Sequence, residues 1–143
     1  MLSIRQYDDA ICADSDRMGR YKDEVTEMCQ RFVKRCGGQD TSGIMIVLRE
    51  LMINAIEHGT SLLNPRISVE LRHMPNHMFK VNVSDTGHGF DYKQLDLDSI
   101  PDDPRVVTNR GYRLIQSFAS AIEFNDKGNS VTVYVPEKSP TSA

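Results

Sequence analysis

The sequence lacks any apolar run near the 18 residues that a membrane-spanning helix needs, and its first residues show no apolar segment typical of a secretion signal. Its 3 cysteines are odd in number and have no C-x-x-C spacing. We therefore expect idle or buried thiols in a reducing cytosol, without a disulfide framework or zinc site. The net charge of −3 gives no general attraction to nucleic acid or anionic membranes. These absences indicate a cytoplasmic protein that binds neither nucleic acid nor membranes.

What is present is typical of one domain. The chain has 143 residues, of which 39% are hydrophobic and 26% charged. That length buries a core without disulfides. We expect a single domain over residues 1–143, with 1–13 and 136–143 peripheral to it.

Apolar residues that recur every three or four positions predict three helices. The first follows an N-cap cluster at 14–16 and ends at the glycines 37–38. The second opens near 41–42 and closes at Gly59. The third spans roughly 110–121. Its inward-facing side chains and those just after it are expected to be Leu114, Ile115, Phe118 and Ile122.

Alternation of apolar and polar residues predicts strands over 67–72 and 79–84, joined as a hairpin through Pro75-Asn76. Further strands are expected within 1–13, around 122–124 and over 131–135. Helices and strands do not alternate one for one. This order favours an α+β two-layer sandwich, with a mixed, mainly antiparallel sheet covered on one face by about three helices.

One long segment, 90–109, is acidic, contains proline and has little periodicity. A loop of this length inside a compact domain is usually functional or disordered. We interpret residues 92–108 as a lid that orders over a ligand.

The second predicted helix carries Glu50, Asn54 and His58 at intervals of four, so they climb one face beside the apolar stripe. The amide oxygen of Asn54 suits Mg²⁺, and Glu50 is placed one turn away to accept a proton from an attacking hydroxyl. Taken alone, these acids equally fit a solvated helix surface, and His58 fits a residue near the helix C-terminus.

A second group of residues follows the strand over 79–84. Asp85 could accept a hydrogen bond from an exocyclic amine such as that of adenine. Gly87 and Gly89 allow close approach of a ligand to the backbone. By itself this pattern also fits a simple turn.

A third group, Asn109, Arg110 and Gly111, opens the third helix. Free amides at a helix N-terminus bind anions, so phosphates could lie there with help from arginine. A capped surface helix explains these residues equally well. The ordered occurrence of all three groups favours a nucleotide site over coincidence.

The first two groups belong to two short motifs: E-x-x-x-N-A-x-x-H-G begins at Glu50, and D-x-G-x-G-F-D begins at Asp85. These two boxes resemble the N box and G1 box of the GHKL ATP-binding superfamily, which includes gyrase, heat-shock chaperones and histidine kinases. Within the superfamily the chain looks most like the anti-sigma-factor serine kinases of bacterial partner switching. This family has two glycines before its last helix, and here Asn109 stands in place of the first of them. The family also has a hydroxyl residue before its last strand, and here Ser130 takes that place.

The resemblance implies a Bergerat-type fold that binds ATP and Mg²⁺ without a P-loop. It implies catalysis by Glu50 and a Mg²⁺ ligand in Asn54. The other ATP-binding residues it implies are His58, Asp85, Gly87, Gly89, Asn109, Arg110, Gly111 and Ser130. The implied activity is phosphorylation of a serine or threonine on a STAS-type anti-sigma-factor antagonist, with sequestration of a sigma factor. A homodimer is compatible with it.

Three alternatives stay open. A sensor histidine kinase needs a phosphoacceptor histidine before the ATP domain, and the 4 histidines all lie at or after His58. A nucleotide-binding or partner-binding module without kinase activity would not need the base Glu50. The chain could also be a domain of a larger signalling protein with another target.

Overall fold

The computed structural model describes residues 2–15, 21–36, 41–55, 66–85, 107–125 and 129–137. Within these ranges the chain forms the strands β1 (Ser3–Gln6), β2 (Ala10–Ser15), β3 (Ile67–Met74), β4 (Met78–Asp85), β5 (Ala121–Phe124) and β6 (Ser130–Pro136). The helices are α1 (Tyr21–Arg35), α2 (Ser42–Asn54) and α3 (Val107–Phe118).

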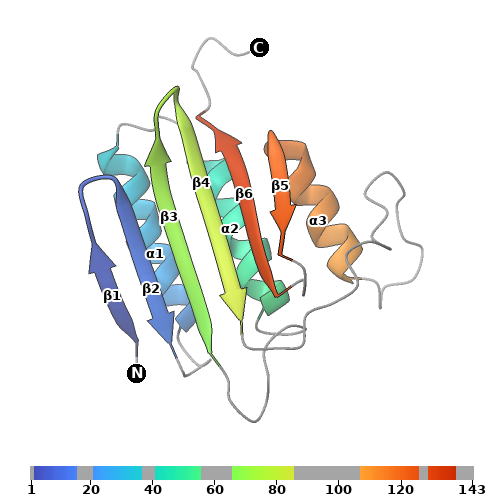
Figure 1. Ribbon diagram of the computed structural model, residues 1–143, viewed down its shortest axis with the longest axis horizontal. Coiled ribbons are helices and arrows are strands. Elements are labelled where there is room, and N and C mark those ends of the chain that lie inside the picture. The colour runs from blue at the N-terminus through green and yellow to red at the C-terminus, as the bar shows by residue number, and fades with distance from the viewer. Residues whose placement is uncertain are drawn as a thin grey trace.

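The described strands form a six-stranded sheet in the order β1-β2-β3-β4-β6-β5. Every neighbouring pair is antiparallel. The helices lie on one side of this sheet, with α1 behind β2 and β3 and with α2 behind β4 and β6 (Figure 1). The predicted α+β two-layer sandwich is therefore confirmed.

The core lies between the sheet and the helices because alternate strand residues point to the helix side. On β4 these residues are Phe79, Val81 and Val83, and all three are buried. From the helices, Phe32 of α1 and Leu48 of α2 are fully enclosed. The opposite face of the sheet carries the polar half of each alternating pattern, as expected for an antiparallel sheet with one open side.

The first strand prediction is corrected. Where one strand was expected within 1–13, residues 3–15 form a hairpin, with β1 paired to β2 from Ser3 opposite Asp14 to Gln6 opposite Ile11. Asp14 and Ser15 were expected to cap the first helix, but they end β2 instead. Pairing with β3 outweighs capping here, because Ser68 of β3 donates a hydrogen bond to the Asp14 carboxylate.

The third helix begins and ends three residues earlier than the predicted 110–121. Ile115 is fully buried, as predicted, and Phe118 packs against the core. Leu114 was expected to point inward, but its side chain is 41% exposed. The face of α3 that packs on α2 is the one that carries Phe118, whose Cδ1 lies 3.0 Å from the position a Cβ would take on Gly43.

The turn that joins β3 to β4 lies at the end of the sheet opposite the end of β4. Asn76 and His77 adopt left-handed backbone conformations, with φ of 65° and 58°. The Glu137 N–H donates to the His77 carbonyl at 2.8 Å, and the Glu137 carboxylate contacts the rings of both His73 and His77. This end of the molecule is therefore tied together by its own side chains. None of the described helices is long and apolar enough to cross a membrane.

Two leucines on different helices test this packing. Leu48→Ala should lower the free energy of unfolding by about 2–5 kcal/mol, because it leaves a cavity in a fully buried site. Leu114→Ala removes the same atoms from an exposed site, so it should change stability by less than about 1 kcal/mol. Urea unfolding of both variants gives the comparison. Equal losses would show that Leu114 is part of the core after all.

Candidate functional site

Four chain segments end or begin at the same edge of the sandwich. Because the strands are antiparallel, the end of β4 meets the start of β6. In Figure 1 the end of α2 and the start of α3 lie at this same, lower edge. α2 also packs on β4, β6 and α3. The fold thus brings together the three sequence regions that were predicted to form the nucleotide site.

Asn54, the last residue of α2, is a buried polar residue with only 7% of its surface exposed. Neither its amide nitrogen nor its amide oxygen has a hydrogen-bond partner in the structure as described. It follows Val47 and Leu51 at spacings of seven and three, so it continues the edge of the buried stripe. A buried polar group without a partner destabilises a protein by about 1–3 kcal/mol. The arrangement therefore suits a ligand that supplies the missing partners.

Glu50 lies one helical turn before Asn54 and is half-buried. The i, i+4 spacing places its carboxylate beside the Asn54 amide on the same helix. The two side chains differ in burial because Glu50 is further from the centre of the apolar stripe. A half-buried carboxylate next to a buried amide can reach a substrate while remaining accessible to protons from solvent.

Asp85 ends β4 and is half-buried. By strand alternation it shares the helix side of the sheet with Val81 and Val83, which is the side that α2 covers. Its backbone N–H donates to the carbonyl of Asn129 at 2.9 Å, so the β4–β6 pairing continues one residue beyond the start of β6. The position of the carboxylate is therefore set by two strands.

Ser130 begins β6, directly opposite Ser84, but its side chain lies on the other face of the sheet. Its hydroxyl is 2.8 Å from the Ser84 hydroxyl and accepts a hydrogen bond from the Asn82 amide at 3.2 Å. The structure thus places the Ser130 backbone beside Asp85 and its hydroxyl away from Asn54. The role of that hydroxyl in ATP binding stays a prediction.

Asn109, Arg110 and Gly111 lie inside α3, since the helix starts at Val107. In a helix that begins at residue 107, the N–H of residue 110 is the first to bond within the helix, so the N–H groups of 107–109 have no partner within it. Asn109 therefore contributes a backbone donor at this edge, and Arg110 and Gly111 follow it directly. His58, Gly87, Gly89 and the predicted lid over 92–108 lie outside the described residues, apart from the first two positions of α3.

Two asparagines near the site were not predicted from the sequence. The Asn82 amide donates to Thr132 and to the Val131 carbonyl, and it accepts from Ser84. Asn125, which follows β5, bonds to Asn129 and Ser130 across the turn. Asn82 is visible in the sequence only as the polar member of an alternating strand. Asn125 was detectable as a turn-favouring residue directly after a strand.

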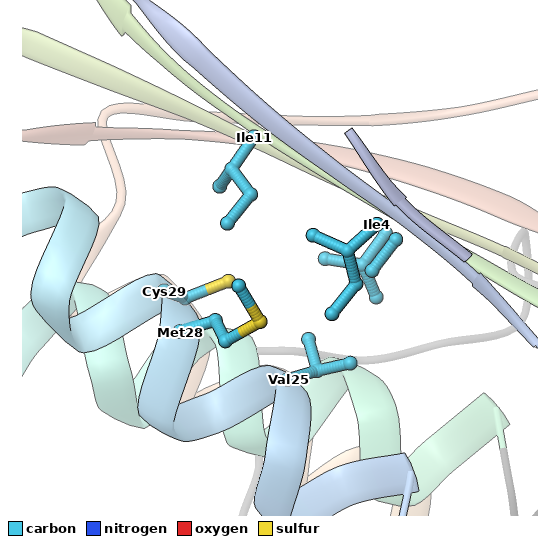
Figure 2. A pocket seen from close by; sticks show the side chains of 7 residues that line it. Ile4, Ile11, Val25, Met28 and Cys29 are labelled. Atoms are coloured by element: carbon cyan, nitrogen blue, oxygen red, sulfur yellow. The ribbon is translucent and has the colours of Figure 1, made fainter. Parts of the chain in front are cut away.

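A separate hollow lies between α1 and the β1–β2 edge of the sheet. Ile4, Ile11, Val25, Met28 and Cys29 point into it, as Figure 2 shows. Burial raises the pKa of the Cys29 thiol to about 12, so this sulfur stays protonated and is a poor nucleophile. The lining offers no charged group to a nucleotide, and this hollow does not contribute to the site.

Comparison with protein families agrees with this geometry. Residues 11–135 match the family described as the histidine kinase-like ATPase domain. The match spans most of the chain, so the protein belongs to this family, which is of the GHKL type. ATP binding is expected for such a domain. A comparison with curated proteins found no match.

The unpartnered amide gives a direct test. Asn54→Leu replaces it with an apolar group of similar size, so it should raise the free energy of unfolding by about 1–3 kcal/mol while abolishing ATP binding. Urea unfolding and calorimetry measure the two effects. Asn82→Leu is the matched control: its amide is fully bonded, so the same change should destabilise the protein. A destabilised Asn54→Leu variant would mean that the Asn54 amide already has a partner.

Proposed function

We propose that the protein is a Mg²⁺- and ATP-dependent kinase that phosphorylates a serine or threonine of a small anti-sigma-factor antagonist with a STAS-type domain. The observation that carries the proposal is the buried, unpartnered Asn54 amide one turn from the Glu50 carboxylate. Family membership supports ATP as the phosphoryl donor. The choice of a protein hydroxyl as acceptor rests on the resemblance of the two boxes to the anti-sigma-factor kinases.

Asn54 fits the requirement for a Mg²⁺ ligand, because its amide oxygen is a hard, neutral donor that lacks a protein partner. Among the described residues no group of three His, Cys, Asp or Glu side chains is arranged to hold a metal. Asn54 would therefore share the ion with phosphate oxygens and water. When bound, Mg²⁺ neutralises charge on the phosphates during transfer.

Glu50 would act as the general base. Its carboxylate accepts the proton from the substrate hydroxyl as that oxygen attacks the γ-phosphorus of ATP. The new oxygen–phosphorus bond forms, the bond between the γ-phosphorus and its bridging oxygen breaks, and ADP leaves with the bonding pair. Asp85 would accept a hydrogen bond from the adenine amino group and hold the base at the sheet edge.

A nucleotide-binding module without transfer activity is the second candidate. It would use Asn54 and Asp85 in the same way and leave Glu50 without a role. Incubating the protein with Mg²⁺ and ATP labelled at the γ-phosphate, together with purified STAS-type antagonists, separates the two candidates. Phosphoserine or phosphothreonine on an antagonist supports the kinase. ATP binding without transfer to any antagonist favours the module.

The proposed partner on the other side of the switch is a sigma factor. This part rests on the family resemblance alone and has no assigned residues. Co-elution of the protein with a purified sigma factor in the presence of ATP, and its loss on adding unphosphorylated antagonist, would support sequestration.

Glu50→Gln should keep ATP binding and partner binding but lose about 10²–10⁴-fold in transfer rate, since the amide cannot take the proton. Single-turnover transfer of labelled phosphate measures the rate, and calorimetry measures ATP binding. A near wild-type rate would make Glu50 a surface acid only. Loss of ATP binding together with activity would assign it a structural role.

Asp85→Asn should weaken ATP binding by roughly tenfold or more with little effect on folding, because a charged acceptor is lost from a half-buried position. Calorimetric titration with ATP, beside urea unfolding of the same variant, separates the two effects. Equal ATP affinity in wild type and variant would refute the adenine role.

A further inference from the structure

Asn125, the residue after β5, bonds through its side chain to the two residues where the described chain resumes, Asn129 and Ser130. The Asn125 amide oxygen accepts hydrogen bonds from the backbone N–H groups of Asn129 at 3.0 Å and of Ser130 at 3.1 Å. Its amide nitrogen donates to the Asn129 side-chain oxygen at 2.6 Å. The Asn125 backbone N–H also donates to the Ser130 carbonyl at 3.1 Å. The Asn125 side chain thereby holds Asn129 and Ser130, the residue before β6 and the first residue of β6.

The peptide group between Asn129 and Ser130 leads to the candidate site. Its N–H, which belongs to Ser130, donates to Asn125 at 3.1 Å, while its carbonyl, which belongs to Asn129, accepts the backbone N–H of Asp85 at 2.9 Å. One residue before Asp85, on the open face of the sheet, the Ser84 hydroxyl contacts the Ser130 hydroxyl and makes a second link between β4 and β6. Asp85 is the last described residue of β4, so these bonds to the β6 side hold it where the strand ends.

We propose that Asn125 is a positioning residue for recognition of the nucleotide base. It holds Asn129 in place, Asn129 holds the Asp85 backbone, and the Asp85 carboxylate then meets the adenine amino group at the correct angle. This inference rests on the proposed function, since it assumes that Asp85 contacts adenine. Asn125 itself contacts no nucleotide in this arrangement.

The consequence is a specific loss of base selectivity. A carboxylate accepts a hydrogen bond from the amino group of adenine but not from hypoxanthine, which carries a carbonyl at that position. Hydrogen bonds weaken steeply as their angle departs from linear. A loosened Asp85 therefore loses more affinity for ATP than for inosine triphosphate, whereas general loosening of the fold weakens both equally.

Calorimetric titration of the full chain with ATP and with inosine triphosphate tests the inference. In the wild type ATP should bind more tightly. Asn125→Ala should narrow this preference by roughly threefold to tenfold, the range expected for one lost hydrogen bond. Asn125→Asp should keep the preference, because a carboxylate still accepts both backbone N–H groups. Glu123→Ala, an exposed truncation on β5 two residues before Asn125, should leave the preference unchanged.

An unchanged preference in Asn125→Ala would overturn the inference, whatever happens to stability. If that variant does not fold, Asn125→Ser takes its place, since its hydroxyl is one atom shorter and cannot serve both N–H groups. Failure of the proposed function is seen in the wild type alone: a wild type that does not prefer ATP removes the adenine role of Asp85, and the inference with it.

Discussion

The central constraint in this structure is the pairing of β4 with β3 on one side and β6 on the other. β3 is paired along the whole of β4, from Met74 opposite Met78 to Ile67 opposite Asp85. β6 is paired from Pro136 to Ser130. Since β4 is held on both sides, its last residue cannot move independently of the sheet. The candidate nucleotide site is thus attached to a strand that is bonded to a neighbour on each side.

The helix side of the site follows a different rule. α2 is held by its buried apolar stripe, and Asn54 continues that stripe with a polar group. Local stability would favour a leucine at this position, so the amide is retained against the packing preference of its surroundings. Such conflicts between local stability and residue identity are typical of functional sites. In this protein the conflict falls on the residue that the N box resemblance assigns to the metal.

Much of the fold could be predicted because its physical signals are local. The stripe of α2 and the alternation in β3, β4 and β6 are set by burial on one face, and these elements lie where the patterns place them. The β1–β2 hairpin was only partly foreseen, because β1 is short and mostly exposed and has weak alternation. Asp14 and Ser15 resemble a helix cap in sequence, and only their pairing with β3 decides otherwise.

The residue types and the order of the candidate site are predictions from the sequence, but its geometry could not be predicted in this way. The spacing of Glu50 and Asn54 is visible in the sequence, whereas the burial of Asn54 depends on how α2 meets the sheet. The position of Ser130 shows the same limit: the chain places it next to Asp85, yet strand alternation turns its hydroxyl to the opposite face. The bonds of Asn125 connect residues across a turn, and no periodic pattern reports them.

The polar side chains on the open face of the sheet determine how many layers the domain needs. Asn82, Ser84, Ser130 and Thr132 bond to one another along this face between β4 and β6, and Ser68 bonds to Asp14 between β3 and β2. Side chains that satisfy their neighbours in this way leave a surface stable in water. This face therefore needs no third layer to cover it, and the candidate ATP site uses only the sheet and the helices on its other side.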